Sequence, residues 1–284
     1  MNNQNRFSRY AGSKIHFTQR FNELIKDFDK DVYIEPFFGS GAIFFNLEYE
    51  FKQYVINDAN KHVINAVASF KQGTFETYKN LKEEAFKNFG DIRENKESYY
   101  LFRNWFNENY FDKGKDLQSE GFYFHFLMNS CINSLVRIGP NGFNQSFGNR
   151  FFFMDEKEFN KIKERLNKNV ILTSMDYHRI LDEFDSEKAV IFLDPPYFAR
   201  NEVGYQKTYQ EDDLKKFIEH IKRLKGKVIY TDIKCQLHDE LGWHAENTKM
   251  LSNISPLRRN ETENQEVFFS NFTPENKKNT VSLF

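Results

Sequence analysis

The 284-residue sequence predicts an α/β fold: an open sheet of parallel strands, interrupted by a mainly helical insert. Short apolar runs typical of buried strands alternate with helical patterns, and this alternation favours parallel strands. Between residues 74 and 165 the pattern changes to helices rich in charged and aromatic residues. The simplest organisation is therefore a discontinuous sheet domain, residues 1–73 and 166–284, with residues 74–165 inserted as a second domain.

The elements of the sheet domain follow from their local patterns. Apolar residues at helical spacing predict a helix over 15–27, and residues 39–51 begin with glycines and turn helical. Further helices are expected at 60–73 and 211–226, each ending at or near a glycine. The expected strands are residues 31–37, 53–58, 169–177, 189–198, 227–232 and 265–272.

The insert has three expected helices and one turn. Residues 75–89 and 97–111 have charged and aromatic helical patterns, and residues 120–136 form a mostly apolar helix. Within residues 137–153, the Gly-Pro-Asn-Gly run has turn chemistry and is flanked by alternating aromatic residues. This segment is therefore expected to be a hairpin or an ordered loop.

Composition and charge limit the class of protein. Hydrophobic residues make up 39% and charged residues 29%, which indicates a globular chain. The formal net charge of -1 gives no bulk support for a nucleic-acid partner, which would need a local basic surface. Cys131 and Cys235 form no disulfide framework or zinc pattern, so a reducing cytoplasm is expected. The sequence shows no hydrophobic signal core and no apolar run long enough to span a membrane.

The first candidate site is "EPFFGSGA", residues 35–42, between an expected strand and a helical segment. Gly39 and Gly41 let the backbone turn tightly and let a ligand approach, and a following helix would point its free N–H groups at that ligand. Asp58 ends the next strand, where an acid accepts the two hydroxyls of a ribose. Phe44 stands where a third glycine would complete a dinucleotide motif, which disfavours NAD. An ordinary strand-to-helix turn with an exposed aspartate is the alternative.

The second candidate site is Asp194-Pro195-Pro196-Tyr197, directly after an apolar run. Adjacent prolines end a strand because neither donates to a ladder. A flat ring bearing an amine would stack on Tyr197, while the Asp194 carboxylate and the Pro195 carbonyl accept its two amino hydrogens. The alternative is a solvated aspartate beside prolines that merely stop a strand.

The motifs in this order resemble the Dam-type adenine-N6 DNA methyltransferases of the alpha group. The resemblance extends from Tyr10 to roughly Asp232. It implies a Rossmann-like S-adenosylmethionine-dependent methyltransferase sheet and, in residues 74–165, a target-recognition domain that contains the hairpin loop. Ser146 stands where the family usually has proline. "YTDIK" (230–234) stands where many members have Ser-Asn. The matching segments are "YAGSK" (10–14), "EPFFGSG" (35–41), "ND" (57–58), "CINSLVRIGPNGFNQSFG" (131–148) and "DPPY" (194–197).

The resemblance also implies site residues. The catalytic residues would be Asp194, Pro195, Pro196 and Tyr197, with Tyr197 stacked on a flipped adenine. The cofactor-binding residues would be Tyr10, Lys14, Glu35, Phe37, Gly39, Gly41, Asp58, Asp176 and Asp194. For Asp176, a plain strand-end aspartate is the alternative. Arg suits guanine edges and Asn or Gln suits adenine, although turn capping and phosphate contacts are alternatives for each residue. The expected DNA-binding residues are Arg137, Asn141, Asn144, Gln145 and Arg150.

The implied function is site-specific methylation of adenine N6 in double-stranded DNA, of the kind used in restriction-modification. S-adenosyl-L-methionine would be the methyl donor and S-adenosyl-L-homocysteine the product, and no metal would be required. The alternatives are methylation of another amine (cytosine-N4, an RNA base or a protein glutamine) and a catalytically inactive DNA-binding relative. The expected compartment is the cytoplasm of a bacterial or phage-infected cell.

The final residues, "NTVSLF" (279–284), faintly resemble tails that dock bacterial sliding clamps, with Asn279 in place of the usual glutamine. A disordered end is the alternative.

Overall fold

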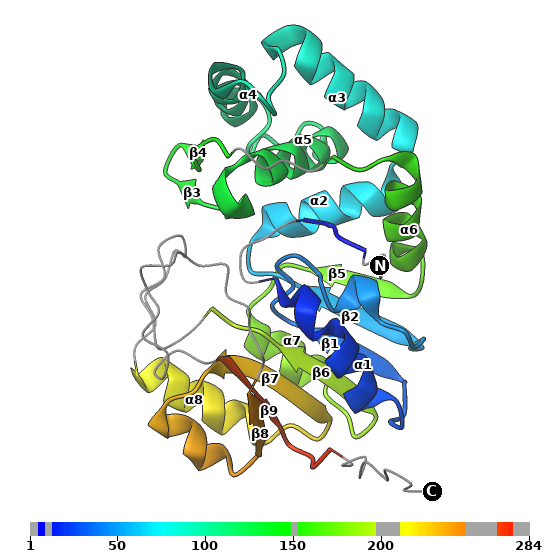
Figure 1. The fold of residues 1–284 in the computed structure, drawn as a ribbon, viewed down its shortest axis with the longest axis vertical. Coiled ribbons are helices and arrows are strands. Elements are labelled where there is room, and N and C mark those ends of the chain that lie inside the picture. Colours follow the sequence, from blue (N-terminus) through cyan, green and yellow to red (C-terminus); the bar gives the residue numbers. More distant parts are fainter. Residues whose placement is uncertain (1–4, 9–12, 149–152, 197–210, 248–265, 275–284) are drawn as a thin grey trace, which may run out of the picture.

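A seven-stranded sheet is the central layer of the lower part of the molecule in Figure 1. The computed structural model describes residues 5–8, 13–148, 153–196, 211–247 and 266–274. The strands lie in the order β5-β2-β1-β6-β7-β9-β8. The first five are parallel, and β9 runs antiparallel between β7 and β8. Their bounds are β1 Val32–Glu35, β2 Gln53–Asn57, β5 Val170–Thr173, β6 Ala189–Leu193, β7 Lys227–Ile233, β8 His244–Asn247 and β9 Glu266–Ser270.

Helices cover both faces of this sheet because successive strand residues alternate between two apolar cores. Phe192 packs in the core beneath α1 (Thr18–Ile25) and α2 (Lys61–Gln72). Its neighbours Ile191 and Leu193 pack in the opposite core. The helices of that second face are α7 (Tyr177–Phe184) and α8 (Glu211–Ile221).

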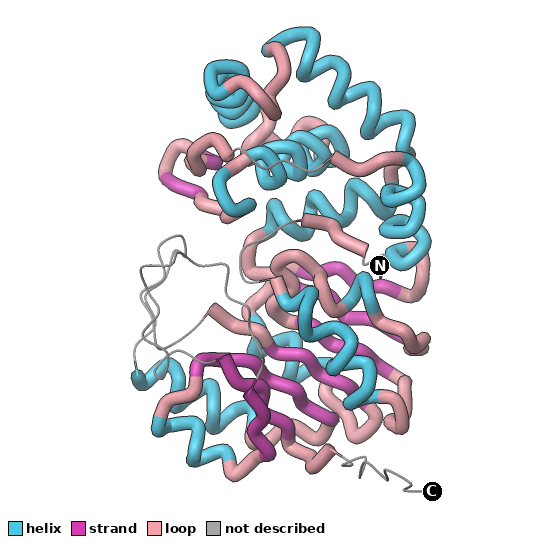
Figure 2. The backbone as a smooth tube through the Cα atoms, viewed as in Figure 1, coloured by secondary structure: helices cyan, strands magenta, loops and turns pink. Residues whose placement is uncertain are grey.

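Most of the insert is helical and lies beyond α2, as the upper part of Figure 2 shows. α5 packs along α2, and all but its first two residues are buried. The rings of Phe70, Tyr78, Phe122 and Phe159 interlock in this region, with Phe70 and Phe159 centroids 4.9 Å apart. The phenylalanines thus extend the core beneath α1 and α2 into these helices as one continuous cluster. The elements are α3 Phe75–Phe89, α4 Lys96–Asn109, α5 Leu117–Ser130, β3 Ile138–Gly139, β4 Gly142–Phe143 and α6 Glu156–Leu166.

The helical expectation for residues 39–51 is wrong. This segment forms only a short 3₁₀ turn, Phe44–Asn46. Both Phe44 and Phe45 are buried, and the Asn46 side chain donates to the carbonyls of Ala42 and Asn5, which ties the turn down. The glycine loop therefore has no α-helix N-terminus behind it; its Gly39 N–H donates to the Asp58 side chain and its Gly41 N–H to the Phe38 carbonyl.

Other differences concern element ends. The helix expected over 120–136 begins at Leu117 and stops at Ser130, because the backbone of Cys131 is extended; Asn133 and Ser134 beyond it have positive φ angles of 55° and 50°. The sequence patterns missed α6, α7 and β8. Each expected strand overlaps an observed one, although the strand expected over 169–177 ends at Thr173 and β7 runs one residue past 232.

Within the described residues, no helix combines the length and apolar character needed to cross a membrane. Nor does this part of the chain hold a group of three or more His, Cys, Asp or Glu side chains placed to bind a metal ion. Both cysteines are free thiols, Cys131 buried and Cys235 half-buried.

Candidate active site

The carboxyl ends of the parallel strands gather the polar residues of the site. Glu35 ends β1, Asp58 follows β2 and Asp194 follows β6. Thr231 lies on the neighbouring strand β7. Because parallel strands end at one edge of a sheet, these side chains converge there, where open α/β sheets bind their ligands.

Asp194 is held by two donors at one of its oxygens. The Lys14 ammonium lies 2.8 Å from Asp194 Oδ1, and Thr231 Oγ1 donates to the same oxygen at 2.8 Å. The Asp194 side chain is 21% exposed. Burial raises the pKa of Asp194, and the charge of Lys14 lowers it. No hydrogen bond from the described residues reaches Oδ2, so that oxygen is open to an incoming donor.

Lys14 joins Asp194 to Glu266, which sequence reasoning did not find. The Lys14 ammonium lies 3.0 Å from Glu266 Oε1, and both side chains are 4% exposed. Glu266 opens β9, opposite Ile233 at the end of β7, because β9 is antiparallel to β7. A polar residue at the start of the apolar run "EVFF" was the available signal.

The glycine loop and Asp58 form the neighbouring part of the site. Gly39 N–H donates to Asp58 Oδ2 at 2.9 Å, and Asn60 N–H donates to Oδ1 at 2.8 Å. Burial raises the pKa of the Asp58 carboxyl, and these two N–H groups lower it. Gly41 has a φ of 64°, and an added Cβ would lie 2.3 Å from the Phe38 ring. An added Cβ at Gly39 would meet nothing within 4 Å, so the loop leaves open space beside a carboxylate.

Glu35 is a further buried acid of this edge. Its side chain accepts a hydrogen bond from the Tyr33 hydroxyl at 2.7 Å. Burial raises the pKa of Glu35 to about 8; the Tyr33 hydrogen bond opposes this, while the charge of Asp194 adds to it. Glu35 is therefore mostly protonated and uncharged at neutral pH, and its carboxyl has a proton to donate.

Phe37 and Asp176 lie at the other side of the glycine loop. The ring centroids of Phe37 and Tyr177 are 5.1 Å apart, which makes an aromatic wall. Asp176 is exposed and caps α7, because its side chain accepts the His178 N–H at 2.9 Å. Helix capping is thus a structural reason for an aspartate at this position.

Asn57 fixes these loops to one another. Its amide donates to the Pro36 carbonyl at 2.9 Å and to the Met175 carbonyl at 3.1 Å. Its oxygen accepts from Thr173 Oγ1 at 2.9 Å and from the Met175 N–H at 2.8 Å. One buried side chain therefore ties the chain after β1 to the chain after β5. The sequence placed Asn57 only as part of the "ND" pair.

The expected DNA-binding residues lie apart from the sheet edge, on the β3–β4 hairpin and the residues after it. Arg137, Asn141 and Asn144 are exposed. The Gln145 side chain is half-buried and accepts the Ser146 N–H at 3.0 Å, so it bonds within its own loop. The Asn144 N–H donates to the Arg137 carbonyl at 2.9 Å and closes the hairpin.

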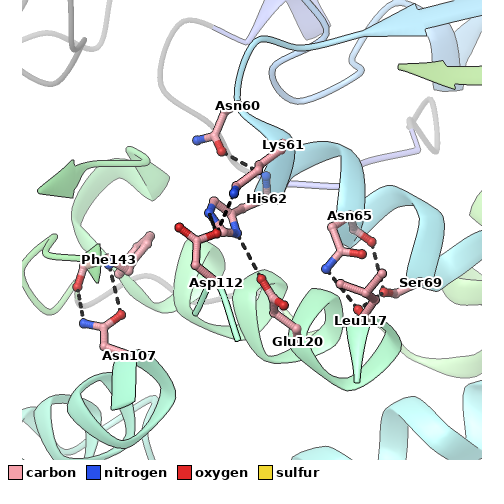
Figure 3. A network of polar contacts seen from close by, with 10 residues as sticks. All are labelled: Asn60, Lys61, His62, Asn65, Ser69, Asn107, Asp112, Leu117, Glu120 and Phe143. Atoms are coloured by element: carbon pink, nitrogen blue, oxygen red, sulfur yellow. Dashed lines mark hydrogen bonds and ion pairs between the residues drawn. The ribbon is translucent and has the colours of Figure 1, made fainter. Parts of the chain in front are cut away.

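Helix α4 holds this hairpin through three side chains at four-residue spacing. The Tyr99 hydroxyl and the Arg103 guanidinium both donate to the Gln145 carbonyl, at 2.9 and 3.2 Å. The Asn107 amide donates to the Phe143 carbonyl and accepts its N–H, both at 2.9 Å (Figure 3). Gly142 has a φ of 101°, and an added Cβ would lie 2.6 Å from Asn107 Oδ1. Only glycine suits that position.

Polar contacts also join the insert to the start of α2, next to the Asp58 loop. His62 Nδ1 lies 3.1 Å from Glu120 Oε1, and Lys61 pairs with Asp112 at 2.7 Å (Figure 3). The His62 ring stacks on Phe111, with centroids 4.2 Å apart. The aromatic core and these contacts together hold Phe111, Asp112 and Glu120 against the start of α2.

Four of the residues proposed from sequence, Lys14, Glu35, Asp58 and Asp194, therefore meet at one edge. The expected roles of Tyr10, Tyr197 and Arg150, and of the tail from Asn279, concern positions outside the described residues.

A mostly parallel sheet with a glycine loop, an acid after β2 and an Asp-Pro-Pro run after β6 fits a Rossmann-like methyltransferase. Comparison with known proteins agrees. The family model of D12 class N6 adenine-specific DNA methyltransferases matches residues 10–254. The chain belongs to this family.

Individual relatives are consistent with this membership. The chain is 31% identical over 221 residues to the Type II methyltransferase M.MjaIII of Methanocaldococcus jannaschii, which spans 73% of this chain and 74% of the relative. It is 27% identical over 241 residues to a DNA adenine methylase of Haemophilus influenzae, or 80% of each chain. The Dam-type resemblance is thus confirmed. The chain is an adenine-specific DNA methyltransferase, and its family implies S-adenosylmethionine as donor and DNA as substrate.

Proposed function

We propose that the carboxyl edge of the sheet methylates N6 of an adenine flipped out of duplex DNA, at a short sequence selected by the inserted residues 74–165. The hydrogen bonding of Asp194 is the observation that carries this proposal. Lys14 and Thr231 bind Oδ1, so Oδ2 would accept one hydrogen of the target amine and the Pro195 carbonyl would accept the other. Proline backbone keeps that carbonyl rigid.

The proposed chemistry depends on the geometry of the target nitrogen. The lone pair of the adenine amine is delocalised into the ring, and accepting both hydrogens favours a pyramidal nitrogen with a localised lone pair. S-adenosylmethionine, when bound, supplies the electrophilic methyl group. Holding the reactants in line contributes roughly 7–11 kcal/mol to lowering the barrier. Asp194 stabilises the positive charge that develops on the nitrogen, and the excess proton leaves afterwards.

The residues that would hold the cofactor fit a nucleoside. Asp58 would accept the ribose hydroxyls, and the open space at Gly39 admits the ligand beside it. Phe37 supplies an aromatic wall, Gly41 shapes the loop and protonated Glu35 is a donor. Asp176, at the cap of α7, would lie near the adenine of the cofactor, and Tyr10 would contact it.

Lys14 acts through Asp194 in this proposal, because its ammonium already pairs with Asp194 and Glu266. Its expected contact with the cofactor is therefore secondary to its hold on the catalytic carboxylate.

The exposed side chains of the hairpin would select the DNA sequence. Arg137 suits a guanine edge, and Asn141 and Asn144 suit adenine. Extruding the target base costs a few kcal/mol, and stacking on Tyr197 would offset part of that cost. The similarity to Type II methyltransferases supports a role in restriction-modification.

The test is to express the wild type and Asp194→Ala in a host that lacks adenine methylation, and to sequence the DNA with detection of modified bases. The wild type should methylate adenines in one short motif, and Asp194→Ala should leave the DNA unmodified while the purified protein still binds cofactor. Asp239→Ala, which removes an exposed aspartate of the same domain, is the control and should methylate normally. Methylation by Asp194→Ala, or unmodified DNA from folded wild-type protein, would overturn the proposal.

A further inference from the structure

We propose that Glu266 is a positioning residue of the active site, which holds Lys14 against Asp194 and keeps the charge of this buried triad at minus one. The inference rests on the role proposed above for Asp194. The triad is defined as Asp194, Lys14 and Glu266.

Both carboxylates of the triad pair with the Lys14 ammonium. Nζ lies 2.8 Å from Asp194 and 3.0 Å from Glu266. Lys14 and Glu266 are almost completely buried, and Asp194 is one-fifth exposed. A buried ammonium needs a paired carboxylate. A second carboxylate fixes the position of the ammonium and favours its charged form.

The position of Glu266 in its strand supports a specific role. Val267, Phe268 and Phe269, which follow it, are all buried apolar residues, as expected for a strand in the middle of a covered sheet. An ionised carboxylate at such a position is costly unless it is paired. The antiparallel direction of β9 brings this one charged residue to the edge where Asp194 and Lys14 already lie.

The charge balance suits a reaction with cationic species. Asp194 and Lys14 alone would form a neutral pair, whereas Glu266 restores one net negative charge. The methyl donor is a sulfonium cation, and the target amine gains positive charge during transfer. Charges in a partly buried site act more strongly than in water, so the net charge of the triad affects the rate.

Other acids near the triad are held by hydrogen bonds from tyrosines. Glu35 is protonated at neutral pH, because burial raises its pKa to about 8, and Tyr33 bonds it. On the β7 side, the Tyr230 hydroxyl donates to buried Asp232 at 2.5 Å. In the triad itself, Lys14 lowers the pKa of Asp194 and Glu266 raises it, besides the larger effect of burial. Removing Lys14 should therefore raise the pKa of Asp194, and removing the charge of Glu266 should lower it.

The experiment compares Glu266→Gln, Lys14→Met and the double variant. In Glu266→Gln, the acid-side midpoint of kcat/KM against pH should fall by about one pH unit, since a nearby charge shifts the pKa of a carboxyl by about that much. The kcat of this variant should also drop about tenfold, because Lys14 is no longer held against Asp194. In Lys14→Met the midpoint should rise by about one unit or more. The double variant, which keeps one negative charge, should return towards the wild-type midpoint.

A second readout uses the ligand-free protein. Lys14→Met leaves two buried carboxylates without their cation, so its melting temperature should fall more at pH 8 than at pH 5. Adding Glu266→Gln should remove most of that difference. Glu246→Gln is the matched control, because Glu246 lies on the neighbouring strand β8, is 39% exposed and pairs with Arg20 instead of Lys14. Its pH profile should equal that of the wild type.

Two outcomes separate this inference from the proposed function. A wild-type midpoint in Glu266→Gln, or a loss of activity in that variant without a change of midpoint, would overturn the role of Glu266 and leave that of Asp194 standing. Full activity of Asp194→Ala would instead overturn the proposed function itself.

Discussion

The sheet edge and the β3–β4 hairpin are held in place by different physics. At the sheet edge, buried charges from distant parts of the chain fix one another: Lys14, Asp194 and Glu266 form a network with Thr231. At the hairpin, side chains of α4 bond the backbone of the loop, as Asn107 bonds Phe143 and Arg103 bonds the Gln145 carbonyl. In the first region the residues that hold the site also set its charge. At the hairpin, the residues that hold the loop differ from the exposed residues that we propose to contact DNA.

This difference has a consequence for variation. Backbone bonds from α4 leave the exposed hairpin side chains replaceable without loss of the loop. A change at the sheet edge alters charge and geometry together. We therefore expect changes at the edge to affect the rate and the pH dependence, and changes around the hairpin to affect the choice of DNA.

The largest effect is expected from Asp194→Asn, which keeps the shape of the side chain and removes its charge. The rate of methyl transfer should fall on the order of 10³-fold, as when one stabilising group is removed from an active site. Single-turnover kinetics on a cognate duplex would measure it. The hairpin variant Asn141→Ala should change this rate by much less, and equal losses in the two variants would contradict the comparison.

The second prediction concerns the glycine loop of the sheet edge. Gly41→Ala combines a φ of 64° with a Cβ 2.3 Å from the Phe38 ring, so the free energy of unfolding should fall by roughly 3 kcal/mol. Gly39→Ala, with a φ of 51° and open space, should cost only about 1–2 kcal/mol. Urea denaturation measures both. If the two variants were equally stable, the crowding at Gly41 would not be the cause.

The third prediction concerns pH. The folded-state pKa of Glu35 is raised to about 8, so its contribution to stability is present below the unfolded pKa and is lost as pH rises through the folded value. Between pH 6.5 and 8 the protein should lose about 2 kcal/mol through this group. Below pH 6.5, buried His125 acts in the opposite sense, because burial lowers its pKa to about 4.

Unfolding of the wild type and Glu35→Gln over this pH range would test that prediction. The variant should show a much flatter dependence between pH 6.5 and 8, whereas Asn107→Ala at the hairpin should keep the wild-type slope. An unchanged slope in Glu35→Gln would mean that another group titrates.

The smallest effect is expected from Asn107→Ala. Loss of its paired bonds to Phe143 should loosen the hairpin and raise KM for DNA about tenfold, which corresponds to about 1.4 kcal/mol, with kcat nearly unchanged. Discrimination between cognate and near-cognate duplexes should weaken as well. Asn109→Ala is the control, because the one bond its amide makes with the described residues is to the Trp105 carbonyl of its own helix. A fall in kcat with KM unchanged would show that the hairpin acts on chemistry.

Local patterns determined much of this protein. Apolar runs predicted the strands and placed Asp58 and Asp194 at strand ends, while the family resemblance added Glu35; parallel strands end together, which is why the three acids share one edge. The order of the motifs predicted the family. The one clear error, a helix over 39–51, arose because burial of both Phe44 and Phe45 outweighs helical preference there.

Only the tertiary structure decided the partners of those residues. Glu266 reaches Lys14 because β9 runs antiparallel beside β7, and strand direction is not encoded in the pattern of β9 itself. Asn57 and Asn107 look like ordinary polar residues in sequence, yet each is bonded to backbone from a distant segment. A side chain shows its residue type in the sequence, but the charge and hydrogen bonds around it exist only once the chain has packed.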